Sequence, residues 1–145
     1  MAQMATCSNP YFDVSRMEID REGYTYTVDT MTEIRRILGD EVAIYFITGA
    51  DAILEILTWK DAARLLRLCG FVAVTRPGYR VEDLDNLTGD LKARFGCDVH
   101  VVDAPSPAIS STDIRRRASE GRSFKYLVPE DVERYIIKND LYTDR

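Results

Sequence analysis

Short apolar runs that alternate with stretches of helical periodicity are the feature that most limits what this chain can fold into. Val42 to Ile47 and Phe71 to Thr75 are rich in β-branched and aromatic residues, which is typical of strands covered on both faces of a sheet. Asp98 to Val102 is predicted as a third strand. Strands that alternate with helices predict an α/β domain with a parallel sheet, whose ligands bind beyond the carboxyl ends of the strands. Candidate sites therefore follow Thr48, Thr75 and Asp103.

The segments around these runs carry helical signals. Thr27 is expected to cap a helix that runs to about Leu38, and Gly39 suits its carboxyl end. Thr58 and Asp61 have the spacing of an approximate capping box for a later helix. The apolar stripe of the first of these helices comprises Val28, Met31, Ile34 and Leu38. Further helices are expected over Met1 to Cys7, Asp51 to Leu57, Thr58 to Leu68, Val81 to Phe95 and Val128 to Ile137, and an extended segment over Phe12 to Ile19.

A single domain is expected, because a chain of 145 residues is long enough to bury one core and too short for two ordinary ones. The proline-rich segment Ala104 to Ala108 is too short to separate independent domains. We therefore expect residues 1–145 to form one α/β domain, in which residues 104–142 are a helical subregion.

The charge and the apolar pattern exclude several classes of protein. With 24 acidic and 19 basic side chains, the net charge is -5, which argues against a general affinity for nucleic acid or for an anionic membrane. The longest apolar run is far shorter than the roughly 20 residues that span a bilayer, and the amino terminus shows no secretory signal. The expected location is the cytoplasm. Cys7, Cys69 and Cys97 have neither a redox nor a zinc spacing, so we interpret them as reduced packing residues.

The first candidate site follows the first apolar run. Gly49 would allow a ligand to approach the backbone, and Asp51 has a carboxylate that accepts hydrogen bonds from two sugar hydroxyls. The alternative is that Gly49 turns the chain and Asp51 caps the next helix.

The second candidate site lies at the start of an arginine-rich helix. Ser110, Ser111 and Thr112 place hydroxyl groups and free backbone N–H groups there, with Arg115 one turn further on. This combination suits a phosphate, because N–H donors orient the anion and arginine neutralises it. The alternative is a serine cap on a solvated basic helix, in which Arg116 and Arg117 face water.

Trp59 is the only tryptophan, and its ring is suited either to stacking on a planar heterocycle or to packing in the core. Thr27 is either a ligand contact or only a cap. His100, the only histidine, alternates with valines inside a predicted strand and is interpreted as structural. The residue pattern shows no catalytic histidine.

Taken together and in this order, the motifs of residues 5 to 142 resemble the bacterial nicotinate mononucleotide adenylyltransferases. The resemblance rests on Thr25-Tyr26-Thr27 with Asp29-Thr30, Tyr45 to Asp51, Trp59, Arg76-Pro77-Gly78-Tyr79, Ile109 to Arg115, Tyr126 to Pro129, and Tyr135-Ile136 with Leu141-Tyr142. It implies a Rossmann-like nucleotidyltransferase fold. It also implies transfer of AMP from ATP to nicotinate mononucleotide, with Mg²⁺ on the phosphates, to give deamido-NAD and pyrophosphate.

The same resemblance implies a role for each candidate site residue. On the mononucleotide side it implies contacts from Thr27, Trp59, Lys60 and Arg76. On the ATP side it implies that Gly49 and Asp51 lie against the adenosine, and that the phosphates are lined by Ser110, Ser111, Thr112 and Arg115.

The sequence departs from the family pattern at its start. The family begins with a strand and a Gly-x-Phe-x-Pro-x-His-x-Gly-His loop, whose histidines stabilise the α-phosphate, and this sequence contains no such motif. We therefore expect an amino-terminally truncated form that lacks the first strand and helix and is inactive by itself. Two other functions remain as alternatives: a related nucleotidyltransferase with another phosphorylated substrate, and a non-catalytic fragment that binds nucleic acid. The sequence leaves the oligomeric state open.

Overall fold

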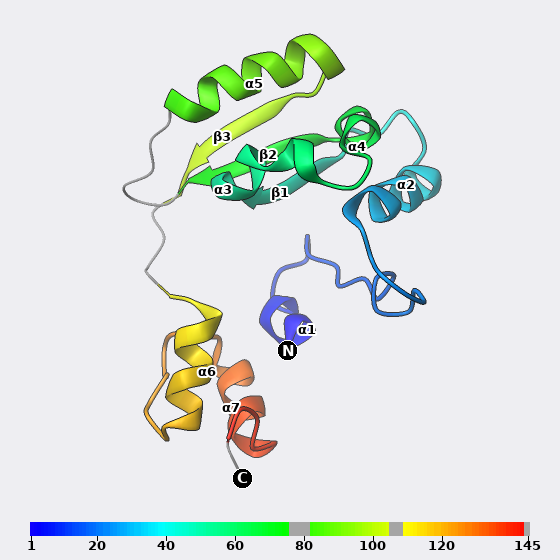
Figure 1. The fold of residues 1–145 in the computed structure, drawn as a ribbon. Coiled ribbons are helices and arrows are strands. Elements are labelled where there is room, and N and C mark those ends of the chain that lie inside the picture. The colour runs from blue at the N-terminus through cyan, green and yellow to red at the C-terminus, as the bar shows by residue number, and fades with distance from the viewer. Residues whose placement is uncertain (76–81, 105–108, 144–145) are drawn as a thin grey trace. The chain divides into compact units, whose positions relative to one another are not determined.

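The structure is a computed structural model that describes residues 1–75, 82–104 and 109–143. The chain folds into two compact units (Figure 1). The larger unit contains residues 17–106, and the smaller one combines residues 1–16 with residues 107–145. Each unit has its own cluster of buried apolar side chains.

A three-stranded parallel sheet organises the larger unit. Its strands β1 (Tyr45–Gly49), β2 (Gly70–Thr75) and β3 (Val99–Asp103) lie side by side in chain order. Tyr45 is paired with Gly70, and Phe71 with Val99. This register brings the carboxyl ends of all three strands to the same edge. The α/β fold class predicted from the sequence is confirmed.

Helices connect the strands and enclose the core. They are α2 (Thr27–Leu38), α3 (Ala50–Leu54), the short 3-10 helix η1 (Ile56–Thr58), α4 (Ala62–Leu68) and α5 (Glu82–Phe95). The core lies between these helices and the sheet, with Phe71, Ile53, Ile56, Leu65 and Leu84 fully buried. The connections from β1 to β2 and from β2 to β3 run in the same direction along the sheet. Because such crossovers are right-handed, their helices lie on the same face of the sheet.

The helices of the larger unit therefore leave the other face of the sheet uncovered, so within this unit the strands are not covered on both faces as expected. Tyr45 of β1 and Val102 of β3 are each 44% exposed, and Ile47 of β1 is 70% exposed. Burial alternates along β2, where Phe71 and Ala73 on the helix-covered face have no exposed surface.

Several local predictions need correction. Thr27 is the first residue of α2 and not its cap, because Tyr26 has the extended conformation of the N-cap and no side chain caps the helix. Val28 and Met31 are buried as expected, whereas Leu38 is half exposed. The predicted capping box is also wrong, because Asp61 precedes α4 in a left-handed conformation without a side-chain cap. Gly39 ends α2 with φ 81°, as predicted.

Other boundaries also shift. The first strand begins at Tyr45, not at Val42, and the helix expected over Asp51 to Leu57 is divided between α3 and η1. Residues 13–16 are irregular and residues 17–19 form a turn, so no strand forms where an extended segment was expected.

Cys69 and Cys97 are buried at the start of neighbouring strands, whereas Cys7 is exposed, and all three are free thiols. Burial raises the pKa of Cys69 to about 12 and that of Cys97 to about 11. Both buried thiols therefore stay protonated and behave as small apolar residues.

The described residues of the smaller unit form the helices α1 (Ala2–Thr6), α6 (Ser111–Ser119) and α7 (Glu130–Lys138). Its core contains Ile114, Phe124, Val132 and Ile136. Helix α1 packs against α7, so the amino-terminal residues belong to the same unit as the carboxyl-terminal helices. No helix within the described residues is long and apolar enough to cross a bilayer.

Candidate functional site

Three of the four residues expected on the mononucleotide side lie around one pocket of the larger unit. Thr27 at the start of α2 lines it together with Trp59 and Lys60, which follow η1. The pocket has a volume of about 200 Å³. The fourth residue, Arg76, lies outside the described residues. The remaining lining residues are Thr25, Tyr26, Val28 and Leu65.

Trp59 packs against the core and also lines the pocket. Its ring packs against the core, where it meets Phe46 edge to face with ring centroids 6.1 Å apart. It is only partly buried, however, and it also lines the pocket. Core contacts thus hold in place a ring that is also accessible from the pocket.

Lys60 supplies a positive charge at the rim of this pocket. Its Nζ lies 3.4 Å from Oδ2 of Asp29 and 3.9 Å from the centre of the Tyr26 ring. Both contacts are exposed to solvent. They therefore orient the ammonium group while it stays accessible to water. Tyr26 is a pocket residue to which sequence reasoning gave no role, because it precedes the threonine that was interpreted as a cap.

Gly49 and Asp51 lie together at the carboxyl end of β1. Gly49 has an extended backbone with φ -69°, and a Cβ atom added there would overlap with Oδ1 of Asp51. The missing side chain of Gly49 therefore makes room for the Asp51 carboxylate. Asp51 lies in the first turn of α3 and makes no cap hydrogen bond, so the alternative of a glycine turn followed by an aspartate cap is wrong.

A second polar pair lies at the same edge of the sheet. Thr75, which is 3% exposed at the end of β2, donates a hydrogen bond of 3.0 Å from Oγ1 to Oδ1 of Asp103 at the end of β3. The sequence placed candidate sites after both residues but did not predict their contact. The contact follows from the strand register, which pairs Thr75 with Asp103.

The expected phosphate-side residues lie at the start of α6 in the smaller unit. Ser110 is the N-cap and accepts a hydrogen bond of 3.1 Å from the backbone N–H of Asp113. Ser111 and Thr112 follow in the first turn and are exposed. Arg115 is also exposed, with Nη2 3.5 Å from Oγ1 of Thr112, and no carboxylate of the described residues pairs with it. The serine cap of the alternative interpretation is therefore present.

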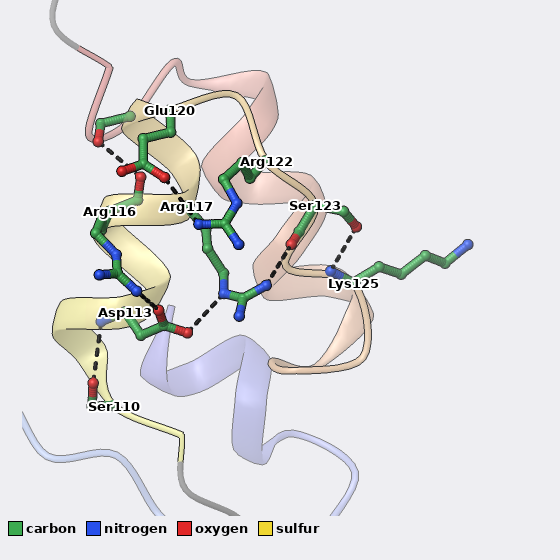
Figure 2. A network of polar contacts seen from close by, with 9 residues as sticks. Ser110, Asp113, Arg116, Arg117, Glu120, Arg122, Ser123 and Lys125 are labelled. Carbon is green, nitrogen blue, oxygen red and sulfur yellow. Dashed lines mark hydrogen bonds and ion pairs between the residues drawn. The ribbon is translucent and has the colours of Figure 1, made fainter.

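The arginines after Arg115 are paired with a carboxylate. The side chain of Arg116 is 60% exposed, as the solvated interpretation expects, whereas that of Arg117 is only 29% exposed. Arg116 and Arg117 donate to the two carboxylate oxygens of Asp113 at 2.6 and 2.7 Å (Figure 2). Arg117 also donates to the carbonyl oxygen of Ser123 at 3.3 Å. Its hydrogen bond, followed by that of Arg116, lowers the pKa of Asp113.

Arg122 pairs with Glu120 at 3.2 Å. Of the five basic residues from Ser111 to Lys125, only Arg115 and Lys125 thus lack a carboxylate partner within the described part of the chain. The charge available to an external anion is therefore smaller than the sequence count indicates.

No group of three or more histidine, cysteine, aspartate or glutamate side chains comes together among the described residues. The carboxylates at the strand ends, Asp51 and Asp103, stand on separate elements. This donor set fits a Mg²⁺ ion carried mainly by nucleotide phosphates, since Mg²⁺ in such sites takes only one or two protein carboxylates.

Comparison with known proteins agrees with this arrangement. A parallel sheet with polar groups at the carboxyl edge is typical of nucleotide-binding α/β proteins, and residues 1–117 match the family model described as cytidylyltransferase-like. A "Probable nicotinate-nucleotide adenylyltransferase" of Thermoanaerobacter sp. is 56% identical over 142 residues, which are 98% of this chain and 67% of that protein. A protein of the same name from Moorella thermoacetica is 55% identical over 145 residues, again 67% of its length.

The chain thus belongs to the cytidylyltransferase-like nucleotidyltransferases and, within them, to the nicotinate-nucleotide adenylyltransferase family. It spans about two thirds of the length of these two relatives. Its fold is similar to that of the Plasmodium falciparum nicotinic acid mononucleotide adenylyltransferase complexed with APC, with a TM-score of 0.62 at 20% identity. That match covers 83% of this chain and 60% of the Plasmodium chain.

Proposed function

We propose that the enzyme to which these 145 residues belong transfers AMP from ATP to nicotinate mononucleotide, giving deamido-NAD and pyrophosphate. The observation that carries the proposal is the gathering of Thr27, Trp59 and Lys60 around one pocket of about 200 Å³. A threonine hydroxyl, an aromatic face and a cation suit a planar acid, because they supply a donor, a stacking surface and a counter-charge.

In this proposal the pyridine ring stacks on Trp59 and its carboxylate is held by Thr27 and by the backbone near Lys60. Arg76 contacts the rest of the mononucleotide. The ammonium group of Lys60 already contacts Asp29 and the Tyr26 ring. We therefore propose that its side chain adds positive electrostatic potential at the rim of the pocket and does not bind the carboxylate directly.

Contacts with ATP are proposed for residues of both units, each unit considered by itself. Asp51, seated over Gly49, accepts hydrogen bonds from the adenosine sugar. Ser111, Thr112 and Arg115 line the phosphates, while Ser110 holds the first turn of α6 in place. Mg²⁺ bound to the phosphates neutralises part of their charge.

The reaction needs no covalent enzyme intermediate. A phosphate oxygen of nicotinate mononucleotide forms a bond to the α-phosphorus of ATP, and the bond from that phosphorus to the bridging oxygen of pyrophosphate breaks. The residues of this chain contribute by holding the two nucleotides in line and by neutralising charge on the departing pyrophosphate.

A polypeptide of only these 145 residues is proposed to be inactive, because it contains no His-x-Gly-His loop to stabilise the α-phosphate. The test compares it with a loop-containing form, in which the same residues follow an amino-terminal segment that carries this loop, taken from a family member in which the motif is present. With ATP, Mg²⁺ and nicotinate mononucleotide, only the loop-containing form should release pyrophosphate.

Turnover by the 145-residue polypeptide, abolished by Arg115→Ala, would show that the loop is dispensable. Competition between nicotinate and nicotinamide mononucleotides tests the substrate class. A loop-containing form that accepts neither, but accepts another phosphorylated substrate, would favour the related nucleotidyltransferase. The ion pairs of Arg116, Arg117 and Arg122 weigh against the nucleic-acid alternative, because they reduce the charge available to a phosphate backbone.

A further inference from the structure

A network of four side chains fastens the segment before the pocket to α2. Thr30 donates from Oγ1 to Oε1 of Glu18 at 2.7 Å. Arg21 donates from Nη1 to Oγ1 of Thr30 at 3.1 Å and from Nη2 to Oε2 of Glu33 at 3.0 Å. We call Glu18, Arg21, Thr30 and Glu33 the Arg21 clamp.

The clamp is partly withdrawn from water, and this strengthens its contacts. Thr30 is only 6% exposed, and the side chains of Arg21 and Glu33 are 20% and 39% exposed. Charge-assisted hydrogen bonds in such surroundings are stronger than those of fully exposed ion pairs. Arg21 carries the one positive charge of the clamp, so its removal would leave Glu33 without its cationic partner and Thr30 without a donor.

Both ends of the clamp connect to the wall of the pocket. On the loop side, Thr25 donates from Oγ1 to the carbonyl oxygen of Glu18 at 3.3 Å. On the helix side, the N–H of Thr30 donates to the carbonyl oxygen of Tyr26 at 3.2 Å. Thr25 and Tyr26 line the pocket, whereas no clamp residue does so.

We propose that Arg21 is a positioning residue that sets the affinity for the pyridine nucleotide by holding Thr25, Tyr26 and Thr27 at the pocket. The inference rests on the proposed function and adds to it a group that touches no substrate. Without the guanidinium, the segment before α2 samples other positions, and each binding event has to restore the pocket wall. The ATP contacts lie on other elements, so ATP affinity should change little.

The experiment measures steady-state kinetics and thermal unfolding for variants of the loop-containing form. Arg21→Ala should raise KM for nicotinate mononucleotide about 5- to 20-fold, with kcat and KM for ATP within about twofold. Arg21→Lys should recover only part of the loss, since one ammonium group cannot reproduce the two-pronged geometry. Arg36→Ala, an exposed position in the last turn of α2, is the matched control and should match the unchanged protein.

Glu33→Gln provides a second, milder variant in case Arg21→Ala fails to fold, and it should raise the same KM to a smaller extent. Amide hydrogen exchange gives an independent readout. Loss of the clamp should speed exchange in residues 24–28 and leave β2 unchanged.

Equal losses for both substrates, or a drop in kcat with unchanged KM, would mean that Arg21 only supports the fold. Arg21 and Glu33 variants that behave like Arg36→Ala would equally overturn the inference. If the unchanged loop-containing form does not use nicotinate mononucleotide at all, the proposed function fails instead.

Discussion

Arg115 differs from its neighbours on α6 in what it contacts. Arg116 and Arg117 are held by Asp113, whereas Arg115 lies beside Thr112 with no carboxylate partner among the described residues. An anion at the start of α6 would therefore meet one uncommitted guanidinium group and the first-turn N–H groups. This contrast allows neighbouring residues of the same type to serve as target and control.

Arg115→Ala should reduce kcat/KM for ATP about 10- to 150-fold in the loop-containing form, because charge-assisted hydrogen bonds are worth roughly 1.5 to 3 kcal/mol each. Arg115→Lys should recover part of this loss. Arg116→Ala should have little effect, because Arg117 still binds Asp113. Steady-state kinetics on folded variants makes the comparison. If Arg115→Ala and Arg116→Ala both lowered kcat/KM for ATP by the same small factor, the phosphate site would be wrong and the interpretation as a solvated helix would hold.

Trp59→Ala should weaken nicotinate mononucleotide more than ATP, since loss of a stacking ring costs roughly 1 to 3 kcal/mol. The ring also packs against Phe46, so Trp59→Phe, which keeps an aromatic face, is the control for lost packing. KM values for both substrates, together with the unfolding temperature, separate the two effects. A parallel loss of affinity for both nucleotides would assign Trp59 to the core alone.

The family resemblance implied which side chains would share one side of the site, but it did not indicate what each one touches. Thr27, Trp59 and Lys60 lie around one pocket as the motifs indicated. The pairing of Asp113 with two arginines was missed because three- and four-residue spacings on a helix allow several alternative pairs. The contact between Thr75 and Asp103 depends on strand register, which no local pattern specifies.

At the scale of elements, the sequence predicted the order of strands and helices and missed several of their ends. Strand β1 begins three residues later than its apolar run, because apolar content indicates burial and not where pairing starts. Helix α2 was given a side-chain cap, but its first turn is closed by the carbonyl oxygen of Tyr26, which accepts from the N–H groups of Asp29 and Thr30. Because every residue has a backbone carbonyl group, an acceptor of this kind cannot be predicted from residue type.

The arginine pairs of Asp113 should make the stability of the smaller unit depend on acid pH. The folded state lowers the pKa of this carboxylate, so its contribution is complete above the ordinary value of about 4 and is lost as pH falls through the lowered folded pKa. Asp113→Asn should therefore flatten the loss of stability below about pH 4. The test is to measure the urea unfolding midpoint of both proteins by far-UV circular dichroism at several pH values around and below about pH 4.

The matched control is Asp85→Asn, at an exposed position of α5 in the other unit. It should follow the unchanged chain at every pH. A flattened profile in the control as well would show that the acid sensitivity belongs to the total charge and not to the Asp113 pairs.

At the scale of the whole molecule, the sheet face that the helices of the larger unit leave uncovered carries apolar side chains on neighbouring strands. Ile47 is the most exposed of these side chains at 70%. A polypeptide of only these 145 residues should therefore bind the dye ANS in its folded state. Ile47→Thr should reduce the fluorescence and increase the soluble yield without lowering the unfolding midpoint, because threonine keeps the β-branched shape.

Ile137→Thr is the control, since Ile137 is similarly exposed at 61% but lies on α7 in the smaller unit. It should change dye binding much less. Equal reductions from the two substitutions would mean that the dye reports scattered apolar residues and not the sheet face.

The smaller unit is assembled from both ends of the chain, and this has a consequence during translation. Helix α1 ends at Thr6 and its packing partner α7 begins at Glu130. At roughly 5 to 20 residues per second, a ribosome needs about 6 to 25 seconds to pass from one to the other. In that interval the strands and helices of residues 17–106 are already synthesised, while α1 waits for its partner. A premature stop codon shortly before α7 would therefore leave α1, which is synthesised well before it, without a surface to pack on.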